Sequence, residues 1–146
     1  DFSHNPDDLL RLTAELEAGA DVAVGSRYSK GVTVVNWPMS RLLMSYCASR
    51  YVRIVTGMPV CDATAGFVGY KREVLAAIDF DRIEMVGYGF QIEMKYTAWK
   101  MGFRIGEVPI IFADRTEGTS KMSGGIFGEA FFGVLALPFR TIARKK

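Results

Sequence analysis

Hydrophobic and polar positions along the chain predict an alternation of helices and strands. Leucines recur at helical spacing between Pro6, which suits a helix start, and Gly19, which suits a helix end, so a short amphipathic helix is expected there. Residues 21–25 (DVAVG) are mostly small and apolar, which predicts a buried strand. A helix followed by a buried strand is the order of elements found in parallel sheets.

A long loop and a long helix are expected next. Residues 26–38 contain glycine, asparagine and proline with little periodicity, and this composition is typical of a loop. Residues 39–57 return to a helical pattern that ends at Gly57.

The second half of the chain repeats helix and strand patterns. The expected elements are a strand at 66–70, a short helix at 72–78, a helix at 90–101 that ends at Gly102, and a strand at 103–112 interrupted by Pro109. A polar, glycine-rich segment at 114–125 then precedes an apolar helix at 126–142. The predicted fold class is therefore α/β, with a mostly parallel sheet flanked by helices.

Composition and charge limit the classes of function. With 146 residues, 49% of them hydrophobic and 23% charged, the chain is long enough for one core and too short for two domains. The net charge of +2 is too small to indicate nucleic-acid binding, and four of the 18 basic residues lie at the end of the chain, at Arg140, Arg144, Lys145 and Lys146. No nucleic-acid partner is expected.

The cysteines and the first residues add two expectations. Cys47 and Cys61 form no CxxC pair and are too few for a secreted disulfide scaffold, so reduced thiols in a cytosolic compartment are expected. The start, DFSHNPDD, resembles neither a signal peptide nor an initiator terminus, so we expect that the chain continues upstream.

Five short segments contain most of the residues that could carry chemistry. They are residues 1–6 (DFSHNP), 25–28 (GSRY), 37–41 (WPMSR) with Ser45, 62–67 (DATAGF), and 87–93 (GYGFQIE) leading to 107–109 (EVP) and 114–121 (DRTEGTSK). In this order, across nearly the whole chain, they closely resemble the inverting family 2 glycosyltransferases that make polyprenyl-phosphate mannose. The resemblance to the related glucosyl and aminoarabinosyl transferases is less close.

This resemblance implies a GT-A fold, of which residues 1–146 would be a single partial domain, the C-terminal, acceptor-binding part. It also implies mannose transfer from GDP-mannose to a dolichyl or polyprenyl phosphate, with inversion and with a divalent cation (Mg²⁺ or Mn²⁺). Two alternatives stay open: transfer of glucose or another sugar to the same lipid, and a non-catalytic acceptor- or membrane-binding module. Because the part that recognises the nucleotide base would be absent, we expect the isolated chain to be inactive.

The resemblance places a metal site at the start of the chain. Asp1 matches the second acid of an Asp-x-Asp motif that binds the metal and the donor diphosphate, and the first acid would lie upstream. Hard cations take oxygen ligands and neutralise a departing diphosphate. Ser3 stands where many relatives have glutamine, and it would reach a metal only through water. His4 is expected to be neighbouring scaffold.

Three residues match positions that hold the acceptor phosphate in the family. Arg27 follows a buried strand at its carboxyl end, where α/β folds place ligands. Arg41 and Ser45 are four residues apart, so one helix face can present a guanidinium and a hydroxyl to one phosphate. From spacing alone, an Arg41 that faces solvent is the favoured alternative. Trp37, just before this helix, suits a membrane interface.

Two further cations match the family positions that act on the leaving diphosphate. Arg115 and Lys121 flank a glycine in a polar loop, and cations there would stabilise the charge that grows as the diphosphate departs. Asp62, Gln91 and Glu93 match positions near the sugar and the acceptor. A buried acid can equally be a structural hydrogen-bond anchor, and that alternative stays open.

The chemistry implied needs cations more than it needs a base. A phosphate monoester is already mostly dianionic at neutral pH, so the acceptor brings its own nucleophile, whereas bringing two anions together requires positive charge. The chain contains no Gln-x-x-Arg-Trp motif of the processive polysaccharide synthases, which favours a single transfer.

The apolar helix at 126–142 and the basic end at 140–146 suggest where the protein acts. The helix is interrupted by Glu129 and Pro138 and is too short to span a bilayer, so it resembles an interfacial helix on the cytoplasmic face of a membrane. A helix packed in the core or between subunits is the open alternative.

Overall fold

A three-stranded mixed sheet lies at the centre of the fold in the computed structural model, which describes residues 4–113 and 124–145. The strands are β1 (Val22–Ser26), β3 (Val68–Tyr70) and β4 (Ile105–Pro109), in the order β3-β1-β4. Strand β1 is buried along its whole length, as its small apolar residues predict. It pairs in parallel with β4, from Val22 opposite Ile105 to Ser26 opposite Pro109, and antiparallel with β3.

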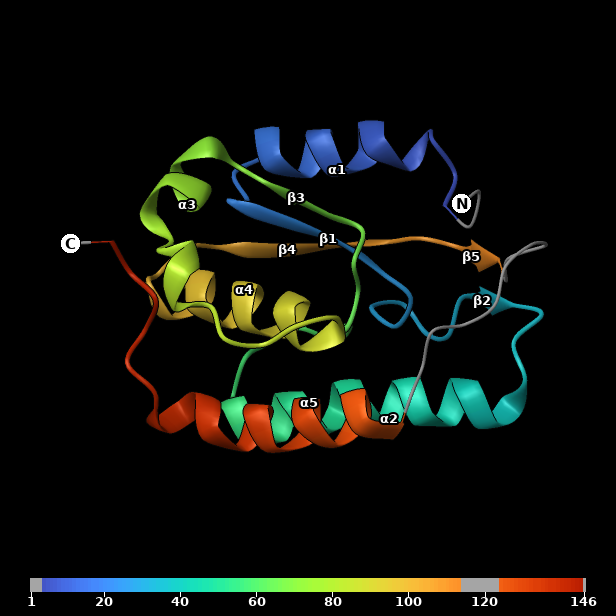
Figure 1. Cartoon of the computed structure of the whole chain (residues 1–146). Helices are drawn as coiled ribbons and strands as arrows, with labels where there is room; N and C mark the ends of the chain where they lie inside the picture. The colour runs from blue at the N-terminus through green and yellow to red at the C-terminus, as the bar shows by residue number, and fades with distance from the viewer. Residues whose placement is uncertain (1–3, 114–123, 146) are drawn as a thin grey trace.

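A second pair of strands continues this arrangement. Strands β2 (Val34–Val35) and β5 (Phe112–Ala113) pair in parallel beyond the ends of β1 and β4 (Figure 1). The expected α/β class with a mostly parallel sheet is confirmed, with β3 as the antiparallel exception. The two-residue strand β2 lies within the segment predicted to be a loop, and β4 ends at Pro109, whose missing N–H cannot continue the ladder.

Helices cover both faces of the central sheet. Helix α1 (Asp8–Glu17) packs on one face, where Leu12 contacts Ala23 and Val108. Helices α3 (Arg72–Ala77) and α4 (Tyr88–Lys100) pack on the other, and α2 (Met39–Thr56) and α5 (Gly124–Ala136) form an outer layer against α4 (Figure 1). The described core therefore has three parts: one between the sheet and α4, one between α4 and the α2–α5 pair, and a smaller one between the sheet and α1.

Glycine and proline set several of the helix ends. Gly57, at φ 72°, ends α2 in the left-handed conformation that glycine adopts without strain. The predicted helix at 126–142 is wrong in length, because α5 ends at Ala136 and a short 3₁₀ turn, η2 (Leu137–Phe139), follows. Pro138 has no N–H to continue the α-helical bonding, which accounts for the earlier end. A second 3₁₀ turn, η1 (Phe80–Arg82), lies before α4.

Candidate functional site

A cavity of about 510 Å³ opens at the carboxyl end of β1. Its walls come from the segment after β1, from α2 and α5, from the start of α4 and from β5. Most of the side chains that α2 and α5 contribute are apolar, among them Met44, Val52, Phe131 and Val134. Arg27, Arg41 and Ser45, predicted from different parts of the sequence, all line this one cavity.

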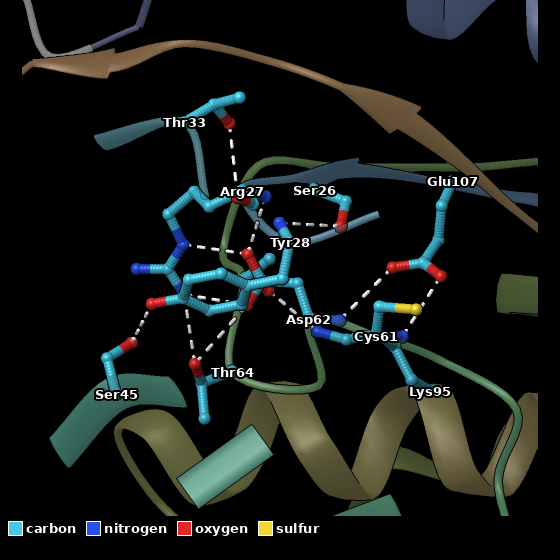
Figure 2. Close-up of polar contacts among 11 residues, drawn as sticks. Ser26, Arg27, Tyr28, Thr33, Ser45, Cys61, Asp62, Thr64, Lys95 and Glu107 are labelled. Carbon is cyan, nitrogen blue, oxygen red and sulfur yellow. Dashed lines mark hydrogen bonds and ion pairs between the residues drawn. The ribbon is translucent and has the colours of Figure 1, made fainter. Parts of the chain in front are cut away.

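Arg27 is fixed by a buried carboxylate. Its Nε donates to Oδ2 of Asp62 and its Nη2 to Oδ1, both at 2.7 Å, and its backbone N–H donates to Oδ2 at 2.9 Å (Figure 2). Nη2 also donates to the Thr64 hydroxyl at 3.0 Å. The Asp62 side chain has no exposed surface. The Nη1 group of Arg27 takes no part in these bonds, so the same guanidinium has further donors to offer.

The surroundings of Arg27 keep it charged. Burial opposes the charge, but the hydrogen bonds and the negative charge of Asp62 outweigh it, so the pKa of Arg27 is raised. The guanidinium carbon lies 5.2 to 5.9 Å from the ring centroids of Tyr28, Trp37 and Phe112. Aromatic faces attract a cation at such distances, which further favours the charged group in this partly dry place.

Helix α2 supplies a second cation and a hydroxyl to the same cavity. The guanidinium of Arg41 lies 4.2 Å from the ring centroid of Trp37, so two arginines contact one indole. The Tyr28 hydroxyl donates to Ser45 Oγ at 2.8 Å, which ties the segment after β1 to α2. Burial raises the pKa of Tyr28, so this tyrosine is a neutral donor.

Two aromatic neighbours complete the polar end of the cavity. His4 stacks on Phe67 with ring centroids 4.5 Å apart, and burial together with the charge of Arg27 lowers its pKa. This packing agrees with the scaffold interpretation of His4. The indole N–H of Trp37 is buried and has no hydrogen-bond partner within the described part of the chain.

The two acids and the amide predicted near the sugar are absent from the cavity lining that the described residues form. Asp62 anchors Arg27, and Glu93, which is also buried, accepts backbone N–H groups from Glu84 and Met85 at 3.1 and 2.8 Å. Gln91 is half-buried near the start of α4. Asp62 and Glu93 thus have clear anchoring contacts, and their predicted role near a sugar stays a prediction.

Four predicted site residues lie outside the described residues: Asp1 and Ser3 for the metal, and Arg115 and Lys121 for the leaving group. Within residues 4–113 and 124–145, no group of three or more His, Cys, Asp or Glu side chains could hold a metal ion.

The structure adds two charged residues that the motif pattern left without a role. Lys95 on α4 is fully buried and its Nζ donates to the carbonyl of Ala65 at 2.6 Å. Glu107 on β4 accepts the backbone N–H groups of Cys61 and Asp62 at 2.9 and 3.1 Å. The sequence offers one sign of each: Lys95 lies among apolar residues of the predicted helix at 90–101, and Glu107 lies inside the predicted strand at 103–112.

Comparison with known proteins identifies the family. The profile of glycosyl transferase family 2 matches residues 1–79, more than half of the chain. The chain belongs to glycosyl transferase family 2. The matched part of this family 2 chain includes Arg27, Arg41 and Ser45, which line the cavity, and Asp62, which anchors Arg27.

Relatives of this family 2 chain carry names from one functional class. The chain is 48% identical over 134 residues to a polyprenol monophosphomannose synthase of Mycolicibacterium smegmatis, covering 92% of the chain and 51% of that protein. It is also 48% identical over 134 residues to an undecaprenyl-phosphate mannosyltransferase of Micrococcus luteus, of which it covers 55%. A dolichol-phosphate mannosyltransferase of Pyrococcus furiosus is 33% identical over 126 residues, covering 85% of the chain and 34% of that protein. The chain thus spans about half the length of the first two relatives.

Helix α5 divides into a buried side and an exposed apolar side. Val134 packs in the core with Val52 of α2, and Tyr51 of α2 stacks on Phe131 with ring centroids 4.7 Å apart. On the outer side Phe132 is 70% exposed, and Phe139 of η2 is 90% exposed. The alternative of a helix packed in the core holds for the buried side, and the interfacial role of the helix stays a prediction. Within those residues, none of the helices has the length and apolar character needed to cross a bilayer.

Proposed function

We propose that the complete protein transfers mannose from GDP-mannose to a polyprenyl phosphate, with inversion at the sugar. The observation that carries this proposal is the composition of the cavity. Two guanidinium groups and a hydroxyl, from Arg27, Arg41 and Ser45, line a cavity whose remaining walls are largely apolar. A ligand with a phosphate at one end and a hydrocarbon chain at the other matches both parts of this lining.

The proposed roles of the arginines follow from charge. The acceptor phosphate is mostly dianionic at neutral pH and must approach an anionic donor, so it needs cations around it. Arg27 offers its Nη1 donors while Asp62 holds the rest of its guanidinium, and Arg41 offers a second fork from α2. The buried Trp37 N–H is a further donor beside both.

The proposed reaction requires no base from this chain. A phosphate oxygen attacks C1 of the mannose, the bond from C1 to the diphosphate oxygen breaks, and GDP leaves with the electron pair. The configuration at C1 inverts, and no proton is moved. Arg27 and Arg41 hold the attacking phosphate, and we expect Arg115 and Lys121 to stabilise the charge on the leaving diphosphate.

Mannose is preferred over glucose in this proposal because the three relatives above are named for mannose-transferring enzymes. We also expect Mg²⁺ or Mn²⁺ to bind through Asp1, with Ser3 contributing through water, and such an ion when bound would neutralise the donor diphosphate. No described residue is assigned to that ion.

We further propose that the protein acts at the cytoplasmic face of a membrane. The exposed side of α5 and η2 carries Phe132 and Phe139 as its most exposed aromatic rings, with one exposed acid, Glu129. Arg144 and Lys145 follow in the sequence, where the chain reaches the end of α3. Aromatic side chains beside basic ones favour an interface with anionic lipid. Replacing Phe132 and Phe139 together by serine should weaken binding to vesicles that contain anionic lipid. Unchanged sedimentation with the vesicles would contradict this placement.

The function is tested with purified full-length protein, a divalent cation and polyprenyl phosphate, offered GDP-mannose or UDP-glucose separately. We expect mannosyl transfer to the lipid and little glucosyl transfer. A preference for UDP-glucose would correct the sugar, and lipid binding without transfer from either donor would indicate a non-catalytic module. The isolated 146-residue chain, assayed in parallel, should show little or no transfer.

A further inference from the structure

The segment that holds Arg27 is itself held by two charged residues from different elements. The segment, residues 61–65, runs between α2 and β3 and carries Asp62 and Thr64, the two side chains that bind the Arg27 guanidinium. At its start, Glu107 of β4 accepts the N–H groups of Cys61 and Asp62. At its end, Lys95 of α4 donates to the Ala65 carbonyl at 2.6 Å (Figure 2).

Lys95 is an unusual choice for a purely structural contact. It is the largest side chain in the molecule's described part that is fully buried, and a lysine is almost never buried without a compensating reason. Burial lowers the pKa of Lys95 to about 7, while the carboxylates of Asp62 and Glu107 favour its protonated form.

Four ionisable side chains meet at this segment. Arg27 donates to Asp62, Glu107 accepts the N–H groups of Cys61 and Asp62, and Lys95 donates to the Ala65 carbonyl. If Lys95 were absent, the Ala65 carbonyl would lose its donor, and residues 61–65 would be held at the Glu107 end only. Asp62 would then hold Arg27 less firmly at the cavity.

We propose that Lys95 is a positioning residue for the phosphate-binding site. By binding the Ala65 carbonyl it fixes residues 61–65, and so determines where Asp62 holds Arg27 at the cavity. The inference rests on the proposed function for its kinetic test, but not for its structural one. Lys95 itself does not line the cavity formed by the described residues, so it acts through residues 62–65 and through Arg27.

The test replaces Lys95 by methionine, which keeps the length and removes both donor and charge, in the full-length protein. Lys100→Met is the matched control, since Lys100 lies on the same helix and is exposed. We expect Lys95→Met to raise the KM for polyprenyl phosphate roughly tenfold or more, the scale of losing a hydrogen bond to a charged group. The KM for GDP-mannose should change less than about twofold, and Lys100→Met should leave both values unchanged.

A double-mutant cycle separates positioning from general loss of stability. In an Arg27→Lys background, which keeps a cation but loses the two-pronged contact with Asp62, Lys95→Met should raise the acceptor KM much less than it does in the wild type. Additive effects, or equal rises in the KM of both substrates, would overturn the proposal. Circular dichroism checks folding, and Lys95→Gln, which retains a donor, replaces the methionine variant if that variant does not fold.

A spectroscopic readout stands apart from activity. In protein labelled with ¹⁵N-arginine, the Nε–H resonance of Arg27, which is hydrogen-bonded to Asp62, should shift in Lys95→Met and not in Lys100→Met. If the wild type transfers no mannose, the proposed function fails while this measurement still decides the role of Lys95. An Arg27 resonance at the same position in the wild type and Lys95→Met would refute it.

Discussion

Asparagine in place of Asp62 tests the buried ion pair that organises the site. Asp62 has no exposed surface and accepts three bonds of 2.7 to 2.9 Å from Arg27. Asparagine has the same shape but no charge, and its NH₂ group would face a donor of Arg27. Removing one partner of a buried pair costs about 3–5 kcal/mol. A typical domain has a free energy of unfolding of about 5–15 kcal/mol, so this loss is a large share.

The matched control is Glu84→Gln, the same loss of charge at an exposed pair. Glu84 lies 3.0 Å from Arg140 without hydrogen-bond geometry, and its side chain is 66% exposed. Exposed pairs contribute about 0–1 kcal/mol. Urea unfolding of both variants and the wild type at one pH and salt concentration gives the comparison. The acceptor KM should also rise in Asp62→Asn alone. Equal losses of stability in the two variants would refute the argument that burial makes the Arg27 pair critical.

Three further outcomes are expected. Arg41→Ala should raise the KM for polyprenyl phosphate while GDP-mannose binding survives, whereas Arg115→Ala should lower kcat by roughly 10²-fold, as when one charge-stabilising donor is deleted. Kinetics that vary donor and acceptor separately would show the reverse pattern if the acceptor-phosphate and leaving-diphosphate roles of the two arginines are misassigned. EDTA should abolish transfer by the full-length protein, and full activity in excess chelator would remove the metal role of Asp1. Burial lowers the pKa of Lys95 from 10.5 to about 7, against the pull of Asp62, so between these values the unfolded chain binds a proton that the folded chain does not. The free energy of unfolding of the wild type, relative to that of Lys95→Met, should therefore rise with pH from about 7 to 10, by at most roughly 5 kcal/mol. If this difference did not change with pH, Lys95 would not be desolvated in the folded protein.

Much of the fold follows from local sequence. The apolar run at 21–25 became β1 because a short, apolar, β-branched segment is stable when both of its faces are buried. Gly57 ends α2 because the left-handed turn at that point costs glycine nothing. Pro138 shows the limit of such patterns, since the apolar periodicity continues to Ile142 while the missing N–H ends the helix at Ala136.

The order of the motifs along the chain was enough to indicate the family, and the arrangement of the charges was decided only in three dimensions. Arg27 and Asp62 are 35 residues apart, and nothing in the local pattern of either predicts their pairing. The parallel register of β1 with β4 places Val24 opposite Glu107, and Glu107 then fixes the backbone of residues 61–62. A one-residue slip of that register would turn the Glu107 side chain to the other face of the sheet.

The burial of Lys95 is likewise a property of packing rather than of sequence. Helix α4 lies between the sheet on one side and α2 and α5 on the other, so every position from Ile92 to Ala98 is buried, whatever its polarity. A helix with one exposed face would have turned a lysine toward water. The sequence by itself determined which residue types were available and where helices and strands begin, because those depend on near neighbours. Tertiary structure alone decided which charges meet, because their partners come from distant elements brought together by the burial of apolar surface.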